Sequence, residues 1–288
     1  MGAMDDDHVR DGPTVSVVIC AYTERRLDAL RRAIRSAAAQ SRPPLEIIVV
    51  IDHNPALAAA VGELPPGARL IENGDEQGLA GARNSGVAAA RGELVAFLDD
   101  DAEAEPGWLD GAVRALERHA ATGVGCAILP RWEGGTAPRL LPPAFWWVCG
   151  CDYSGLPDDG EIRNPIGAAM LVRRDAMDAV GGFSTGLGRI GASATGCEET
   201  ELAIRIRQRL PGATFVRTAD ARVHHEVPRD RQTLRYLLRR CFHEGRSKRW
   251  VAQHVGTESA LSAERTYLVR QVLGGNLCLD DDLDLLFR

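Results

Sequence analysis

The sequence predicts an α/β protein with a Rossmann-like, mostly parallel sheet flanked by helices and with a helical appendage at its C-terminal end. Short apolar runs typical of buried strands recur along the first half, and helical patterns separate them, as in βαβ units. With 288 residues, 45% of them hydrophobic, the chain is long enough for one large α/β core. The strands expected in the first half are Val15–Cys20, Glu46–Ile51, Leu94–Leu98 and Val124–Leu129.

Two helices are expected to pack on these strands. The second begins at Pro106, a favoured first helical position, and turns Trp108 and Leu116 toward the core. In the first helix, the arginines between positions 25 and 35 lie mostly off the apolar stripe, so we expect them to form a solvated face. That stripe consists of Leu27, Leu30, Ile34, Ala37 and Ala38.

The second half of the chain is less regular. Residues 130–165 are rich in glycine, proline and aromatic residues without a clear period, which is typical of a functional loop. Regular structure is expected to resume after this loop and to end in a basic helical region. The expected elements are a strand at 167–172, a short helix to 180, a helix at Glu198–Leu210, short strands at Thr214–Arg217 and Ala221–His225, and helix from 230 to about 254.

Composition excludes several classes of protein. The net charge of -6 and the pI near 5.7 argue against a nucleic-acid partner, because affinity for the phosphate backbone requires a basic surface. The seven cysteines include no C-x-x-C pair, the nearest two being Cys149 and Cys151, so neither a zinc framework nor a disulfide scaffold is indicated. No run approaches eighteen apolar residues. We therefore expect a soluble, cytoplasmic protein.

Three consecutive aspartates, Asp99, Asp100 and Asp101, follow the apolar run Leu94–Leu98. Open α/β sheets bind ligands at the carboxyl ends of their strands, so these acids are expected at a ligand site. If the chain stays extended, Asp99 and Asp101 share one face while Asp100 points away. The pair would then supply two oxygen ligands to a divalent cation, or one ligand and one sugar-hydroxyl acceptor. The alternative is a polar exit from the strand into an acidic helix start.

The helix that begins at Glu198 carries acids in its first turn. At about 100° per residue, Glu199 falls within the buried stripe, Glu198 at its margin and Glu201 nearly opposite. Partial burial would raise the pKa of Glu199 toward the range of a general base. The alternative is a favourable interaction with the helix dipole. The stripe consists of Leu202, Ile206 and Leu210.

Two further segments have both a functional and a structural interpretation. Gly78–Gly86 combines small residues with Arg83, which would allow close backbone approach to a ligand beside a cationic fork, or close packing of a helix on the sheet. His224 and His225 end an expected strand, so one of them points to the ligand side. That histidine is either a metal ligand or a structural hydrogen-bonding group.

The aromatic loop and the basic C-terminal region also allow two interpretations each. Aromatic side chains of the loop, among them Trp132, Trp146 and Trp147, would stack on an acceptor or fill the core. The arginines and leucines between 231 and 249 would bind a membrane surface or phosphates, or form a helix whose charges lie in water.

Taken in order, these segments resemble the inverting family 2 glycosyltransferases, which have the GT-A fold and use nucleotide-sugar donors. The resemblance runs from Val15 to about Lys248, and the order and spacing of its motifs make it specific. The motifs are Ala21-Tyr22-Thr23-Glu24, Asp52 at the end of the second strand, Ala82–Gly86, Phe97–Asp101 followed by Pro106 and Trp108, Gly167–Met170, Val180–Phe183, Glu198–Leu202 and the late histidine.

The resemblance implies a glycosyltransferase domain at 14–228, with a nucleotide-binding half at 14–130 and an acceptor-binding half at 131–228, followed by a helical region at 229–288. The donor would be a nucleotide-diphosphate sugar, a UDP-sugar by the family pattern. The residues implied in donor binding are Ala21, Tyr22, Glu24, Asp52, Arg83, Asp99 and Asp100.

By the same resemblance, Asp99 and Asp101 are the family's D-x-D pair and His225 the late histidine, which together would hold a divalent cation, Mn²⁺ or Mg²⁺. Glu199 would be the general base. The family's usual Glu-Asp pair is Glu198-Glu199 here, so the choice between these two glutamates stays open. The residues expected to contact the acceptor are Trp132, Trp146, Trp147 and Met170.

These roles imply that an acceptor hydroxyl, deprotonated by Glu199, displaces the diphosphate in line and inverts the anomeric centre. The acceptor would be a glycan, a lipid or a natural product. A homodimer, peripheral membrane contact and a place at the inner face of the membrane stay open. The rival interpretations are a catalytically silent sugar-nucleotide or carbohydrate-binding module, and a sugar-phosphate nucleotidyltransferase. The latter would show a G-x-G-x-x-R-like loop where this chain has residues 21–26.

Overall fold

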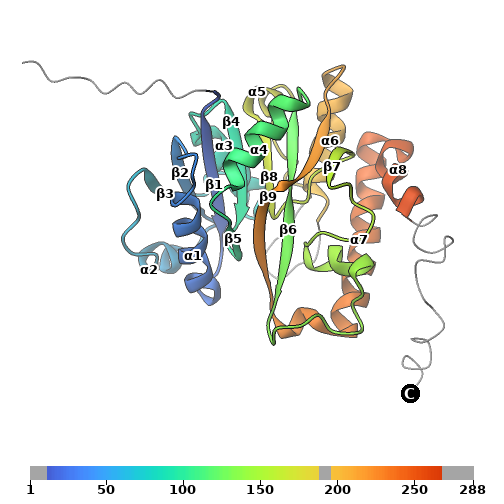
Figure 1. Ribbon diagram of the computed structural model, residues 1–288, viewed down its shortest axis with the longest axis horizontal. Coiled ribbons are helices and arrows are strands. Elements are labelled where there is room, and N and C mark those ends of the chain that lie inside the picture. The colour runs from blue at the N-terminus through green and yellow to red at the C-terminus, as the bar shows by residue number, and fades with distance from the viewer. Residues whose placement is uncertain (1–11, 188–195, 268–288) are drawn as a thin grey trace, which may run out of the picture.

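The computed structural model describes residues 12–187 and 196–267. Their strands form one sheet in the order β3-β2-β1-β4-β8-β6-β9-β5, with β7 paired to β9 off this path (Figure 1). The strands are β1 Val15–Ala21, β2 Glu46–Ile51, β3 Ala68–Glu72, β4 Leu94–Asp99, β5 Ala102–Ala104, β6 Gly123–Trp132, β7 Asp159–Ile162, β8 Ala169–Arg173 and β9 Phe215–Val227.

The sheet is mixed but runs mainly in one direction. Strands β3, β2, β1 and β4 are parallel neighbours, and β6 and β9 form a further parallel pair. Strand β8 is antiparallel to both β4 and β6, so β6 and β9 point the same way as the first four. Strands β5 and β7 oppose β9. This arrangement confirms the mostly parallel α/β sheet that the sequence predicts.

Helices cover both faces of the sheet (Figure 1). On one face α1 and α4 pack into a core that includes Leu30 and Trp108, and on the other α3, α5 and α6 pack around Val87, Met177 and Leu202. The helices are α1 Leu27–Ala38, α2 Pro55–Ala60, α3 Leu79–Ala89, α4 Trp108–Arg118, α5 Arg174–Asp178, α6 Glu198–Arg209, α7 Leu234–Val255 and α8 Thr257–Tyr267, with short 3-10 helices η1 Glu24–Arg26, η2 Pro143–Cys149 and η3 Arg229–Gln232.

The four strands expected in the first half are present as β1, β2, β4 and β6. The prediction of two short strands between 214 and 225 is wrong, because β9 is a single strand over Phe215–Val227. Its pairing with β6 shifts register between Cys126 and Ala127, where Ala219, Asp220 and Ala221 have no partner in β6. Ala219 and Asp220 lie in the break that the sequence pattern indicated.

The expected loop at 130–165 contains η2 and β7 as well as irregular segments. The basic helical region after 230 is η3 followed by α7 and α8, although residues 268–288 of the expected C-terminal region lie outside the described part of the chain. Among the described residues, no helix is both long enough and apolar enough to cross a lipid bilayer.

Candidate active site

The three aspartates lie at the junction of β4 and β5. Strand β4 ends at Asp99 and β5 starts at Ala102, so Asp100 and Asp101 form a turn rather than the extended chain that the sequence argument assumed. Strand β5 pairs with β9 in a register that sets Ala102 opposite His225. The backbone N–H of Glu226 donates to the Asp101 carbonyl oxygen at 2.9 Å. This pairing brings Asp101 beside a histidine more than 120 positions later in the chain.

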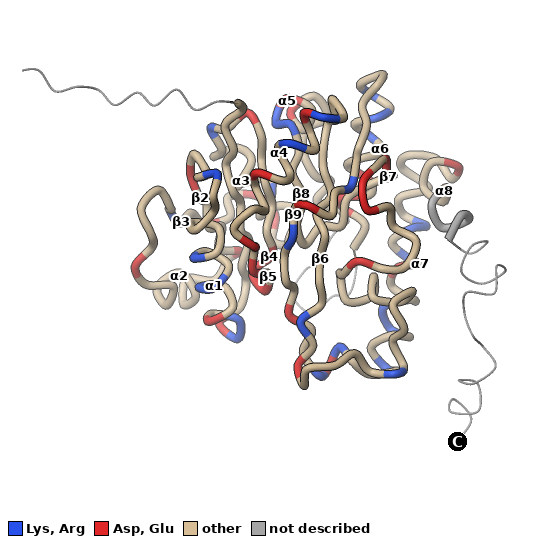
Figure 2. The backbone as a smooth tube through the Cα atoms, viewed as in Figure 1, with Lys and Arg blue, Asp and Glu red and all other residues tan. Residues whose placement is uncertain are grey.

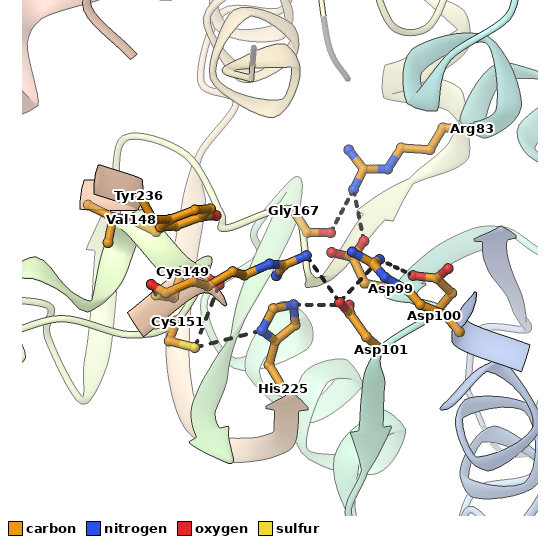
Figure 3. A network of polar contacts seen from close by, with 12 residues as sticks. Arg83, Asp99, Asp100, Asp101, Val148, Cys149, Cys151, Gly167, His225 and Tyr236 are labelled. Carbon is orange, nitrogen blue, oxygen red and sulfur yellow. Dashed lines mark hydrogen bonds and ion pairs between the residues drawn. The ribbon is translucent and has the colours of Figure 1, made fainter. Parts of the chain in front are cut away.

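Asp99, Asp101 and His225 converge on one point (Figure 3). One ligand atom from each lies within 4.8 Å of the others, and the Nε2 atom of His225 is 3.1 Å from Asp101 Oδ1. Two carboxylate oxygens and one imidazole nitrogen suit a divalent cation such as Mn²⁺ or Mg²⁺. The neighbouring His224 turns away and lies 2.9 Å from Glu105 Oε1, as the alternation of a strand requires.

Two arginines that the sequence analysis did not place in the site pair with the aspartates. Arg26, at the end of η1, holds its Nη1 atom 2.7 Å from Asp100 Oδ1 and 3.1 Å from Asp101 Oδ2. Arg231, in η3, lies 3.5 Å from Asp101 Oδ2. The expectation that the arginines around α1 form a solvated face is therefore wrong for Arg26. The sequence does contain a signal for the place of Arg26 in the site. Arg26 comes just after the carboxyl end of β1, and the aspartates lie at the same edge of the sheet.

Burial and these ion pairs shift the pKa values of the two turn aspartates in opposite directions. Burial raises the pKa of Asp100 to about 7 despite the opposing effect of Arg26. Burial also acts to raise the pKa of Asp101, but His225, Arg26 and Arg231 together lower it well below its usual range. Asp101 is thus an ionised carboxylate, which is the form that a cation ligand requires.

Arg83 connects the aspartates to the start of α6. Its side chain, 2% exposed, extends from α3, and its guanidinium lies 3.4 Å from Asp99 Oδ1 and 3.1 Å from Glu198 Oε1. It also donates to the Gly167 carbonyl oxygen at 2.8 Å, and an added Cβ at Gly167 would lie 3.0 Å from the guanidinium (Figure 3). Arg83 therefore lies inside the site, whereas Gly86 lets α3 pack closely on the sheet. An added Cβ at Gly86 would lie 2.4 Å from Val18.

The acids of α6 differ from one another in their surroundings. Glu198 is buried in its ion pair with Arg83. Glu199 is partly exposed, and burial together with the charge of Glu198 raises its pKa to about 7. The sequence places Glu201 nearly opposite the buried stripe, yet Glu201 is only 2% exposed, since Ser184 and Arg205 lie against its carboxylate. Its carboxylate accepts from Ser184 Oγ at 2.8 Å and from Arg205 Nε at 2.6 Å.

The residues expected to bind the nucleotide lie at the carboxyl ends of β1 and β2. Ala21 is buried, while Tyr22 is 40% exposed with the Arg26 guanidinium 5.8 Å from its ring centre. Glu24 accepts from Asn54 Nδ2 at 3.1 Å. Asp52 is buried and accepts from the Gly78 N–H at 3.0 Å, so it also holds the start of α3.

Three of the four residues expected to contact an acceptor lie together near the aromatic loop. The rings of Trp132 and Trp146 meet edge to face at 5.6 Å, and both pack partly against the core, as does Trp147. Met170 is different. It is fully buried in β8 opposite Phe97, within the core on the face of α3 and α6, so its assignment to the acceptor site is corrected.

The chain matches the family described as "Glycosyl transferase family 2" over residues 16–181. It is 33% identical over 241 residues to the glucosyl-dolichyl phosphate glucuronosyltransferase of Haloferax volcanii, an alignment that covers 82% of this chain and 76% of that protein. It is 29% identical over 266 residues to the succinoglycan biosynthesis protein ExoM of Rhizobium meliloti, covering 89% and 78% of the two chains.

The fold is also that of a solved glycosyltransferase. A crystal structure of GalNAc-T7 with UDP, GalNAc and Mn²⁺ superposes with a TM-score of 0.55 at 18% identity. The superposition covers 75% of this chain but only 44% of that chain. Together with the sequence relatives, it defines the protein as a glycosyltransferase with the GT-A fold. Within that class, the chain belongs to glycosyl transferase family 2, since the family match spans more than half of its length.

Proposed function

We propose that the protein transfers a sugar from a UDP-sugar to an acceptor hydroxyl, with inversion at the anomeric carbon and with a divalent cation bound by Asp99, Asp101 and His225. In this proposal Glu199 is the general base. We assign the nucleotide-binding half to 14–130, the acceptor-binding half to 131–228, and a separate C-terminal region to 229–288.

This proposal rests mainly on one observation. Asp99, Asp101 and His225 converge beside Arg83, which also contacts the start of α6. The three ligand atoms lie within 4.8 Å of one another, and the Arg83 guanidinium bridges Asp99 to Glu198, the neighbour of the proposed base. A cation at this point would neutralise charge on the departing diphosphate. The oxygen and nitrogen donors of the cluster fit Mn²⁺ or Mg²⁺.

The surrounding side chains then have separate tasks. Arg26 and Arg231 already face the aspartate carboxylates and are placed to contact phosphate oxygens of a donor. Glu199, with its pKa raised to about 7, is well matched to accept a proton from a hydroxyl group near neutral pH. Glu198 is less suited to the role of base, because its Oε1 atom is engaged by Arg83.

The comparisons support the choice of donor and acceptor. The solved relative of this fold was crystallised with UDP and Mn²⁺, which favours a uridine nucleotide and manganese. The Haloferax relative is named for glucuronosyl transfer involving glucosyl-dolichyl phosphate, which favours a lipid-linked saccharide over the other glycan and natural-product acceptors. Membership of family 2 also argues against the sugar-phosphate nucleotidyltransferase alternative.

The test combines binding and turnover on the same proteins. Calorimetry would measure UDP binding with and without Mn²⁺, and release of UDP from a panel of UDP-sugars with polyprenyl-phosphate saccharide acceptors would measure transfer. We expect Asp101→Ala to abolish metal-dependent UDP binding. We expect Glu199→Gln to keep UDP binding and to lower transfer by about 10²–10⁴-fold, the usual contribution of a general base.

Two exposed acids in first helical turns provide matched controls. Asp28→Ala in α1 and Glu258→Gln in α8 should leave both readouts unchanged. Undiminished transfer by Glu199→Gln would remove that residue from the mechanism. Metal-dependent UDP binding that survives Asp101→Ala would remove the cation cluster, and UDP binding without any turnover across the panel would favour the silent-module alternative.

A further inference from the structure

Helix α7 displays large apolar side chains on its outer surface. Among the described residues, the large hydrophobic side chains that are exposed are Tyr22 in the site and three on this helix, Leu234, Leu238 and Phe242. Their exposed fractions on α7 are 39%, 61% and 66%. At about 100° per residue the three lie within an arc of about 80°, so they form one stripe rather than scattered contacts.

Arginines border this apolar stripe. Arg235, Arg246 and Arg249 are exposed and fall within about 40° of Phe242 around the helix axis. Figure 2 shows Lys and Arg recurring along α7. The helix contains a single acid, Glu244, which is partly buried and pairs with Arg240 at 2.9 Å. The outer face is therefore apolar and cationic on a protein whose net charge is -6.

The opposite face of α7 already anchors the helix. Val251 and Val255 are buried in a core cluster with Leu187 and Ile204, and Ser247 Oγ accepts from the Gly196 N–H at 3.3 Å. The exposed stripe is thus not needed to hold α7 in place. If a stripe of this size stayed exposed to water, it would lower the solubility of the protein and would contribute nothing to its folding.

We propose that the outer face of α7, formed by Leu234, Leu238, Phe242 and the arginines beside them, docks on a lipid bilayer that contains anionic lipids. An apolar stripe flanked by arginines is the pattern of a helix that lies in the plane of the membrane interface. Basic residues close to an anionic surface add electrostatic attraction to the apolar contact. Charge complementarity favours this surface over a neutral protein partner.

Docking through α7 would hold the acceptor side of the site near the lipid headgroups. Helix α7 follows η3, which carries Arg231 to Asp101, and the Tyr236 hydroxyl donates to the Val148 carbonyl oxygen of η2 at 3.4 Å. Short contacts therefore link α7 to the site and to the aromatic loop. The inference goes beyond the proposed reaction, because it concerns where the protein binds and not what it transfers.

Vesicle co-sedimentation of the full chain, without donor, acceptor or metal, tests this proposal independently of glycosyl transfer. Vesicles of phosphatidylcholine that contain roughly 30 mol% phosphatidylglycerol would be compared with vesicles of phosphatidylcholine alone. We expect the chain to bind the anionic vesicles preferentially. The double variant Leu238→Ser, Phe242→Ser should lower the partition coefficient by at least about tenfold, since it removes two apolar contacts.

Charge variants provide the matched controls. Arg235→Glu with Arg246→Glu should also weaken binding to anionic vesicles, whereas Arg35→Glu with Arg114→Glu, on exposed positions of α1 and α4, should leave it unchanged. The substituted side chains are exposed, and circular dichroism would verify that each variant is folded. Equal binding to both vesicle types, or no loss in the apolar variant, would overturn the proposal. So would light scattering that shows a dimer broken by Leu238→Ser, Phe242→Ser without any vesicle binding.

Discussion

Arg83 Nη1 lies 3.1 Å from Glu198 Oε1, and the two side chains are only 2% and 5% exposed. The same guanidinium reaches Asp99 at 3.4 Å. One buried cation thus joins the carboxyl end of β4 to the first turn of α6. Because a buried ion pair loses far more when one partner is removed than it contributes as a whole, this contact should be sensitive to substitution.

Arg83→Met should lower the free energy of unfolding by about 3–5 kcal/mol, since it leaves the Glu198 carboxylate buried without its cation. Urea denaturation followed by circular dichroism measures the change. Arg114→Met removes an exposed arginine paired with Asp110 and should change stability by no more than about 1 kcal/mol. The double variant Arg83→Met, Glu198→Gln should recover part of the loss, and no recovery would contradict the pairing.

The rate of transfer should depend on pH through Glu199. Burial and the neighbouring Glu198 raise its pKa to about 7, and only the deprotonated form accepts a proton. We therefore expect kcat/KM to fall by about tenfold per unit as the pH decreases below that value and to level off above it. Initial rates between mildly acidic and mildly alkaline pH measure the profile.

Asp100 provides the control for this profile, because burial raises its pKa to about 7 as well. Asp100→Asn should retain the acidic limb if Glu199 causes it. A flat profile in Asp100→Asn would instead assign the limb to Asp100.

Binding of the cation and of the nucleotide should be coupled. In the structure Asp101 Oδ2 faces Arg26 at 3.1 Å and Arg231 at 3.5 Å, so a cation entering alone competes with two guanidiniums. A diphosphate offers these guanidiniums new partners. We expect Mn²⁺ to bind about tenfold tighter in the presence of UDP, and UDP to gain equally from Mn²⁺.

Calorimetric titrations in both orders measure this coupling. Arg26→Leu should strengthen the binding of Mn²⁺ alone and reduce the coupling, whereas Arg25→Leu, at the exposed neighbouring position, should do neither. Identical Mn²⁺ affinities with and without UDP would show that the arginines do not compete for the aspartates.

Gly86 lets α3 approach the sheet closely. An added Cβ would lie 2.4 Å from Val18 Cγ1 and 3.3 Å from Val50 Cγ2, so Gly86→Ala should destabilise the protein by about 1–3 kcal/mol. Gly245 lies inside α7, and an added Cβ would meet no atom within 4 Å beyond its chain neighbours and the backbone of its own helix. Gly245→Ala should stabilise the protein by up to about 1 kcal/mol through helix propensity. Chemical denaturation of the two variants should give opposite signs, and equal signs would contradict the packing argument.

Much of the fold could be predicted because the first half obeys local rules. The runs that became β1, β2, β4 and β6 are mainly apolar and mostly buried, which gives a strong signal in a single sequence. The prediction of a break before Ala221 is wrong because of a nonlocal contact. Strand β9 continues through this point by pairing with β6 across a register shift, which local turn propensity does not reveal.

Local sequence patterns located some of the predicted site residues better than others. Asp99, Asp101 and His225 come together, but through a turn and a strand pairing rather than through extension of β4. Arg26 looked like one of several helix arginines, and only the tertiary fold shows its contacts with the aspartates. Met170 belonged to a motif of the family resemblance, yet its side chain points into the core.

The pairing of β5 with β9 has a consequence for how the protein is made. A nascent chain that has emerged only as far as Trp132 contains the three aspartates but lacks His225 and the strand that holds the turn in register. During translation the cluster can assemble only after β9 has left the ribosomal exit tunnel. Synthesis of more than 100 further residues therefore separates emergence of the aspartates from formation of the complete cluster, and a prematurely released chain would be without it.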